Sequence, residues 1–286
     1  MDPTFPVCTF ERVFDTSPLR EVLTLAELVA CFRRFDLRPE LAARVRREVA
    51  GIDRALEEAL AGGVGKAGRG RRRAALASGD APQDERALRE RADKLRSAAQ
   101  KEAKRDLRLW SPALYRDGDG VRRGTEDVLA LSCLVLDYDS GIRIGDAAAA
   151  FQDYFHLIHS TWSHTPEHPK FRIILPLAVA VTAARWSALW EWAEETTGGE
   201  IDPAPKGPAA TYALPAVASP SAPREALTHA APLLDPRELG IDVGPPSRLP
   251  LLRAPVSPMR GEPDKEYVVH DPDAAVYVYD DPEDEP

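Results

Sequence analysis

The stretch Leu131-Ser-Cys-Leu-Val-Leu-Asp-Tyr-Asp-Ser140 combines an apolar run with two acidic residues separated by a single residue. The apolar run predicts a buried β-strand. Because side chains alternate along a strand, Asp137 and Asp139 are expected on one face and Tyr138 on the other. Two neighbouring carboxylates repel each other unless a cation lies between them, and oxygen ligands suit Mg²⁺ or Mn²⁺. The pattern indicates metal-assisted phosphoryl chemistry, although a polar turn that closes a strand contains the same residue types.

The residues on either side of this stretch predict six elements in the order strand, helix, strand, strand, helix, strand. The ranges are 128–136, 145–155, 156–163, 170–178, 182–197 and 210–217. This order is that of an α+β module of the ferredoxin-like or RNA-recognition-like kind, in which the first and third strands are neighbours. We therefore expect Arg172, on the third strand, to lie beside Asp137 and Asp139.

The chain before this module is predicted to be mostly helical, with a short strand at 8–14 and helices at 25–35, 39–60 and 83–104. A Gly-rich basic linker joins the last two helices. In this linker Gly65-Lys66 is followed by Ala67, whereas a P-loop requires Ser or Thr at that position. The linker is therefore not predicted to be a phosphate-binding loop. Its basic side chains are candidates for contacts with DNA phosphates, or form a solvated linker; they are Lys66, Arg69, Arg71, Arg72 and Arg73.

These patterns predict three segments. Residues 1–109 form an N-terminal segment that is part of the catalytic core or accessory to it, residues 110–218 form the catalytic module, and residues 219–286 form a Pro-rich acidic tail that is extended or disordered. The formal net charge of -9 does not exclude a nucleic-acid partner, because the charges are unevenly distributed along the chain. Basic residues are concentrated in the first half, and acidic residues are concentrated at the end.

The composition predicts a globular protein with a sizeable core, since 44% of the residues are hydrophobic and 29% are charged. Neither a transmembrane run nor a secretory signal is apparent, so a cytoplasmic location is expected. The three cysteines are scattered without Cys-x-x-Cys spacing, which argues against disulfides and zinc knuckles. We expect them to be buried as small hydrophobic residues.

Four motifs, taken in order, resemble those of a known superfamily. They are the strand that ends in Asp137-Tyr138-Asp139, the segment from His159 to Leu177, Asp202, and Thr211-Tyr-Ala-Leu-Pro215. Together they resemble the catalytic core of the archaeo-eukaryotic primase (primase-polymerase) superfamily, above all its plasmid and phage branch. The resemblance covers roughly residues 110–215, and the order of the motifs carries more information than any one of them.

The resemblance implies a metal-dependent nucleotidyltransferase, a primase or DNA polymerase that replicates a plasmid, phage or other mobile element. Its implied partners are a single-stranded or primed DNA template, nucleoside triphosphates and a separate helicase. The implied catalytic ligands of Mg²⁺ or Mn²⁺ are Asp137, Asp139 and Asp202. The implied nucleotide-binding residues are Arg172 as the phosphate contact, with Lys170, Thr161, Ser163 and His164 near it.

Two features leave alternatives open. Ile201-Asp202-Pro203 also has the composition of a simple turn. The superfamily commonly has an Arg shortly before the aromatic residue of its last strand, whereas Ala209-Ala210-Thr211 precede Tyr212 here, which predicts a weakened nucleotide pocket. Two alternative functions remain. One is a catalytically weak nucleic-acid-binding replication initiator or regulatory module. The other is a metal-dependent phosphodiesterase or nuclease.

Overall fold

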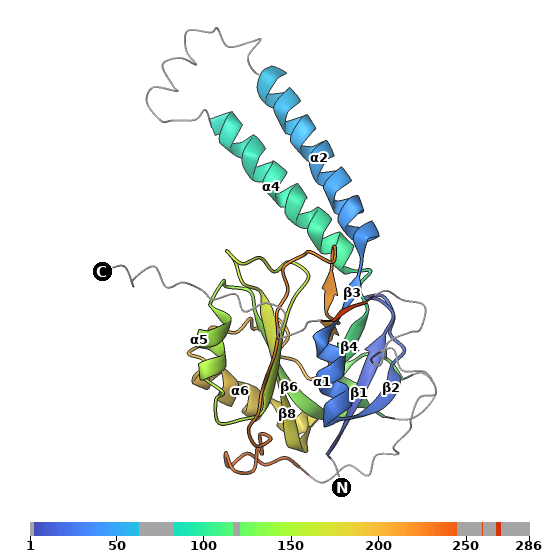
Figure 1. The fold of residues 1–286 in the computed structure, drawn as a ribbon, viewed down its shortest axis with the longest axis vertical. Coiled ribbons are helices and arrows are strands. Elements are labelled where there is room, and N and C mark those ends of the chain that lie inside the picture. Colours follow the sequence, from blue (N-terminus) through green and yellow to red (C-terminus); the bar gives the residue numbers. More distant parts are fainter. Residues whose placement is uncertain (1–2, 63–82, 117–120, 245–258, 260–266, 270–286) are drawn as a thin grey trace, which may run out of the picture. The chain divides into compact units, whose positions relative to one another are not determined.

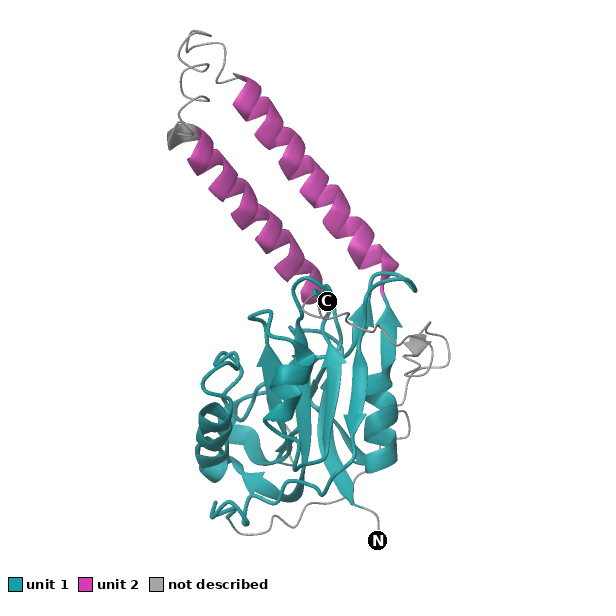
Figure 2. Ribbon diagram, turned by 60° about the vertical axis from the view of Figure 1, so that its left-hand side comes forward, with its two compact units in different colours: residues 1–37, 107–286 teal, residues 38–106 magenta. Residues whose placement is uncertain are grey.

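The structure, a computed structural model, describes residues 3–62, 83–116, 121–244, 259 and 267–269. The chain divides into two compact units, residues 1–37 with 107–286 and residues 38–106 (Figure 2). The predicted segment 1–109 is therefore split between the two units. Its first strands belong with the later part of the chain because Cys8, Thr9 and Phe10 pair with the strand at Leu109–Ser111.

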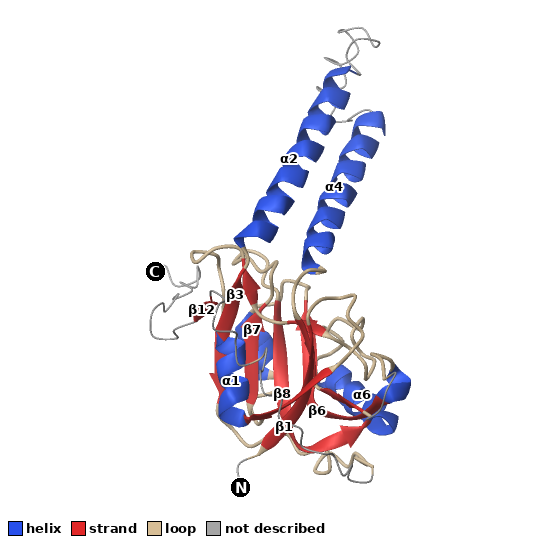
Figure 3. Ribbon diagram, turned by 90° about the vertical axis from the view of Figure 1, so that its right-hand side faces the viewer, coloured by secondary structure: helices blue, strands red, loops and turns tan. Residues whose placement is uncertain are grey.

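The first unit consists of three sheets and their flanking helices (Figures 1 and 3). Its elements are β1 (Thr4–Phe10), β2 (Leu19–Thr24), α1 (Leu25–Arg33), β3 (Arg34–Leu37), β4 (Leu109–Ser111), β5 (Ala113–Tyr115), the 3-10 turn η2 (Thr125–Asp127), β6 (Val128–Tyr138), α5 (Ile144–Ala149), β7 (His156–Ser160), β8 (Phe171–Thr182), the 3-10 turn η3 (Ala183–Arg185), α6 (Trp186–Thr196), β9 (Tyr212–Ala213), β10 (Ala216–Val217), β11 (Ala226–His229) and β12 (Tyr267–Val269). This mixture confirms an α+β class with antiparallel sheets.

The central sheet has five strands in the order β11-β7-β8-β6-β5, and each strand is antiparallel to its neighbours. The predicted proximity of the first and third strands is confirmed, because Asp137 lies directly opposite Arg172. The ferredoxin-like order holds only for β6, β8 and β7. The last predicted strand, 210–217, divides into β9 and β10, which join other sheets, and β5 lies beside β6 in its place.

Alternation along β6 places the sheet between two apolar layers. Leu134, Leu136 and Tyr138 pack in one buried cluster with residues of α5 and α6. Cys133 and Val135 pack in the other, with α1 and with the sheet β2-β1-β4-β9. Figure 1 shows α5 and α6 on one side of β6 and β8, and α1 on the other. Asp137 thus ends the row that faces α1, where the core meets the surface.

The predicted tail is wrong in its first part. Residues 226–229 form β11, which pairs with β7 at the edge of the central sheet, and Leu234 is fully buried beside Leu177. The high proline content did not exclude a short edge strand, where an unpaired backbone edge tolerates proline nearby. Residues 270–286, which carry the acidic end, lie outside the described residues.

The second unit is a pair of helices, α2 (Pro39–Gly62) and α4 (Gln83–Lys104), as the sequence predicts. The five basic residues of the linker, Lys66 to Arg73, lie outside the described residues. No helix in the described part of the chain is long and apolar enough to cross a membrane. All three cysteines are buried and free, as expected, and burial raises the pKa of the Cys8 thiol to about 12.

Candidate active site

The acidic end of β6 forms an ion pair within the central sheet. Arg172 Nη2 lies 3.2 Å from Asp137 Oδ2, with the two side chains 11% and 17% exposed. The pairing follows from the register, since cross-strand partners in an antiparallel sheet project to the same face. The second carboxylate oxygen, Asp137 Oδ1, is buried and has no hydrogen-bond partner among the described residues. One oxygen of Asp137 thus remains available for a further ligand.

The Arg172 guanidinium is enclosed by protein groups on the other side as well. Its Nη1 donates to Ala213 O at 2.8 Å, and its Cζ lies 5.5 Å from the centre of the Tyr212 ring. Tyr212 is fully buried, and this burial raises the pKa of its hydroxyl above the usual range. Both terminal nitrogens therefore already contact the protein, so Arg172 serves first as the internal countercharge of Asp137. Its predicted contact with a phosphate stays a prediction.

His159 continues the same row on β7, directly opposite Arg172. Its ring stacks on Phe32 of α1 at a centroid distance of 5.2 Å, and its Nδ1 lies 3.0 Å from Ser160 O. Burial, followed by the charge of Arg172, lowers the pKa of this imidazole to about 3. The row Asp137-Arg172-His159 therefore contains one neutral ring and one ion pair at neutral pH.

Asp202 approaches Asp137 through the backbone. Its amide donates to Asp137 O at 2.8 Å, and its Oδ1 accepts from Ala204 N at 2.9 Å. The second contact is that of a turn, so the turn interpretation of this residue is correct locally. Both aspartates nevertheless line one cavity of about 440 Å³. Its other lining residues are Arg123, Thr125, Ala204, Pro205, Gly207, Ala209, Ala210, Thr211 and Tyr212.

Arg123 contributes a basic group to this cavity that the sequence analysis missed. Its Nη2 donates to Val13 O at 2.9 Å, and its Cζ lies 5.5 Å from the centre of the Phe10 ring. Its Nη1 is buried without a hydrogen-bond partner among the described residues. The doublet Arg122-Arg123, in the loop that leads into the strand of Asp137, was the available signal. The position of Arg123 in the cavity depends on the conformation of its loop, which no local sequence pattern predicts.

Asp139 lies apart from the cavity. It follows the last residue of β6, is exposed, and has its Oδ2 3.6 Å from Lys170 Nζ. Its carbonyl oxygen lies 3.1 Å from His168 Nε2, and Gly141, two residues after it, has φ +88°. The turn at the end of β6 thus directs Asp139 toward Lys170, whereas Asp137 lines the cavity.

The remaining predicted residues lie in the connection between β7 and β8. Lys170 N donates to His164 Nδ1 at 3.2 Å, and Thr161 N donates to Lys170 O at 2.9 Å. Burial lowers the pKa of His164, which agrees with a neutral ring that accepts a hydrogen bond. Ser163 lies in the same connection. None of Thr161, Ser163, His164 or Lys170 lines the cavity, so their contacts stabilise this connection.

The donor set of the cavity suits a hard cation that keeps part of its water shell. Among the described residues no group of three or more His, Cys, Asp or Glu side chains lies close enough together to hold a metal ion. Mg²⁺, however, is commonly bound by one or two carboxylates with substrate phosphates and water completing its shell. Asp137, with its unpartnered buried oxygen, and Asp202 fit such a site.

Comparison with known proteins gives a family for part of the chain. Residues 97–200 match the VapE N-terminal domain family. The matched segment spans less than half of the 286 residues and contains Asp137 and Arg172. This match confirms the predicted resemblance to a phage- and plasmid-associated family. Among solved structures, the chain is similar to the AEP domain of the cyanophage S-2L primase-polymerase, with 13% identity, a TM-score of 0.35 and coverage of 51% of this chain and 74% of that chain. No curated protein matches the chain.

Proposed function

We propose that the chain is a metal-dependent nucleotidyltransferase that acts on a DNA template during replication of a phage, plasmid or other mobile element. The observation that carries this proposal is the cavity of about 440 Å³ that is lined by Asp137, Asp202 and Arg123. Two carboxylates suit a divalent cation, and a guanidinium suits phosphate oxygens. A nucleoside triphosphate with its cation has both chemical features. The match to the VapE N-terminal domain family supports the replicon context.

Each residue of the cavity has a separate role in this proposal. Asp137 and Asp202 hold Mg²⁺ or Mn²⁺, which supplies neutralisation of the triphosphate and activation of the attacking hydroxyl. Arg123 binds phosphate oxygens with its free amino group. Arg172 is a positioning residue, because its ion pair fixes the rotamer of Asp137 and leaves the other carboxylate oxygen directed elsewhere. Tyr212 supports Arg172 through its buried ring.

A second candidate function is a catalytically weak module that binds nucleotide or nucleic acid. The observation that favours it is the separation of Asp139 from the cavity by its ion pair with Lys170. Nucleotidyl transfer with two metal ions relies on carboxylates that bridge both ions. In the proposed enzyme, Asp139 becomes a ligand only when the Lys170 contact opens, whereas the binding module needs no such change.

Nucleotide incorporation decides between these functions. The protein is incubated with a primed single-stranded template, labelled nucleotides and Mn²⁺ or Mg²⁺, and the variants Asp137→Asn and Asp202→Asn are compared with Asp153→Asn, an exposed aspartate outside the cavity. The enzyme predicts incorporation by the wild type and by Asp153→Asn, and its loss in both cavity variants. Metal-dependent triphosphate binding without incorporation indicates the binding module. Strand cleavage without added triphosphate indicates a nuclease and contradicts both.

A further inference from the structure

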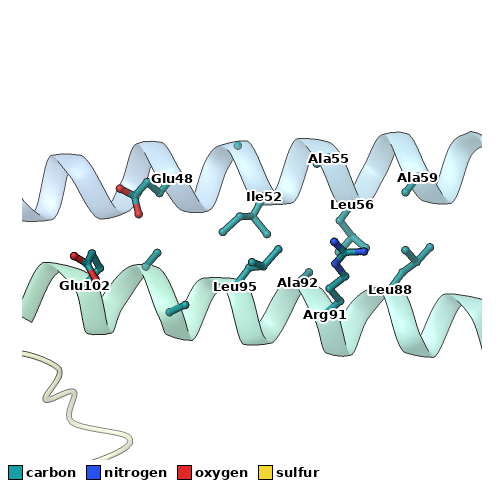
Figure 4. Close-up of a pocket in the computed structure, with 13 residues that line it drawn as sticks. Glu48, Ile52, Ala55, Leu56, Ala59, Leu88, Arg91, Ala92, Leu95 and Glu102 are labelled. Atoms are coloured by element: carbon teal, nitrogen blue, oxygen red, sulfur yellow. The ribbon is translucent and has the colours of Figure 1, made fainter.

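The helical pair α2 and α4 leaves an apolar groove open between its helices. The groove encloses about 760 Å³ and is lined by residues of both helices (Figure 4). On α2 its lining includes the exposed small residues Gly51, Ala55 and Ala59, which recur every four residues. On α4 it is flanked by Leu88 and Leu95. Small residues facing larger ones form the kind of surface on which further helices pack closely.

The apolar side chains of this groove remain accessible to solvent. Leu95 is 47% exposed, and Ile52, Leu56 and Leu88 are only partly buried. The outward side of α4, by contrast, carries exposed ion pairs such as Arg86–Glu90 at 3.0 Å and Arg89–Glu85 at 2.7 Å. The helices therefore have a solvated face and an apolar face, and two helices alone do not cover the apolar face.

Charged residues stand at both ends of the groove with opposite sign. Glu48 and Glu102 face each other from the two helices at one end, and Arg91 lies toward the other end (Figure 4). Within the described chain Glu48 and Arg91 have no ion-pair partner, whereas Glu102 contacts Arg105 at 2.7 Å. The facing carboxylates repel each other. A cation supplied from outside between them would relieve this repulsion.

We propose that this groove is a self-association surface, on which the α2–α4 pair of a second copy of the chain packs antiparallel to form a four-helix arrangement. A two-fold axis perpendicular to the helices, passing between Leu95 and Ala98, brings Arg91 of the second copy onto Glu48 and Glu102. Arg91 and Glu102 are about 16 Å apart along α4 at 1.5 Å of rise per residue, so the axis at their midpoint exchanges the two positions between the copies.

The charges select this arrangement over the other two-fold packing of the same faces. An axis parallel to the helices would superimpose like ends and bring four carboxylates together, which is destabilising. In the antiparallel arrangement each surface is complementary to itself, as a two-fold interface requires. The small residues of α2 then meet their counterparts closely, and Leu95 is covered near the axis. The charges of the groove are thus complementary to those of a second copy in the antiparallel arrangement.

Sedimentation velocity of the full-length protein over a concentration series tests this proposal. The wild type is expected to form a dimer of twice 31.4 kDa. Arg91→Glu and Glu48→Arg should each raise the dimer dissociation constant by roughly tenfold or more, because like charges then meet. Combining the two substitutions should restore much of the association. Lys94→Glu, the same charge reversal at an exposed residue outside the groove, should have no effect.

Cysteine cross-linking keeps the proposal testable if a charge variant folds poorly. The three native cysteines are buried, so a new surface cysteine is the accessible thiol. Ala98→Cys, near the proposed axis, should form an intermolecular disulfide under mild oxidation, and the exposed Gln100→Cys, which lies outside the groove, should not. The proposal is overturned if the wild type stays monomeric. It is also overturned if Arg91→Glu leaves the dimer dissociation constant unchanged and both cysteine variants cross-link equally. In either case another segment or protein covers the groove.

Discussion

Asp137 and Arg172 lie directly opposite each other on β6 and β8 and form an ion pair in which both side chains are mostly buried. The same arginine also donates to Ala213 O and lies against Tyr212. Removal of Arg172 would therefore leave a carboxylate uncompensated inside the protein. The loss of Arg172 should therefore lower the stability of the fold, whether or not a ligand is bound. Arg123 differs, because its Nη1 has no hydrogen-bond partner in the described chain.

Arg172→Ala should accordingly lower the free energy of unfolding by about 3–5 kcal/mol, since breaking a buried pair leaves an unpaired charge. Lys170→Ala is the matched control, because its pair with Asp139 is longer, at 3.6 Å, and more exposed. That variant should lose less than about 1 kcal/mol. Urea denaturation of the three proteins gives the comparison. Equal losses would show that the Asp137 pair contributes no more than a surface pair.

Arg123→Ala should weaken binding of a nucleoside triphosphate with Mg²⁺ by roughly 10- to 100-fold, the worth of a hydrogen bond to a charged group. Arg122→Ala removes the same charge from the neighbouring, exposed residue, which does not line the cavity, and should leave affinity nearly unchanged. Isothermal titration calorimetry measures both. If the two variants lose affinity equally, the effect is one of general charge, and the phosphate site lies elsewhere.

The sequence predicted the parts of this site that depend on neighbouring strands. Alternation and strand order were enough to place Asp137 beside Arg172, because register in a buried sheet leaves little freedom. The separation of Asp139 was not predictable in the same way. The strand ends at Tyr138, so alternation no longer controls the next residue, and a glycine with positive φ turns the chain. The role of Arg123 could not be predicted because its side chain is positioned by Val13 and Phe10, which are distant in the sequence.

Gly141→Ala should lower stability by about 1–3 kcal/mol, because φ +88° strains any residue with a Cβ, and the new methyl would approach His168 Nδ1 to 2.6 Å. The substitution should also disturb the contact of His168 with Asp139 O. Gly145→Ala is the control, since it lies in the first turn of α5 with open space around its Cβ position. It should be neutral or stabilising by about 0.4–1 kcal/mol. Thermal unfolding that ranks the two variants in the opposite order would contradict this view of the turn.

Neutralising the five basic linker residues, Lys66, Arg69, Arg71, Arg72 and Arg73, tests the DNA partner. If they contact template phosphates, affinity should fall for all sequences alike, and each lost contact should reduce the slope of log affinity against log salt by roughly 0.7 to 0.9. Triphosphate binding should be unchanged. A salt-titrated binding series on both proteins provides the measurement, and superimposable curves would show that the linker does not contact DNA.

His159 should make the protein less stable in mild acid. Its folded pKa is lowered to about 3, mainly by burial, so between that value and its ordinary value of 6.5 the unfolded chain binds a proton that the folded protein does not. The stability from this group is complete above pH 6.5 and is lost as the pH falls toward 3. At pH 5 the loss is on the order of 2 kcal/mol.

His159→Asn removes this titration, so the decrease in unfolding free energy between pH 8 and pH 5 should be smaller in the variant by that amount. His156 and His164, whose pKa values burial also lowers, remain in the variant and account for part of the residual decrease. The variant is less stable at pH 8, where loss of the stacking on Phe32 is the main difference, so the pH-dependent difference isolates the proton. Parallel stability curves for the two proteins across this range would falsify a neutral, buried His159 beside Arg172.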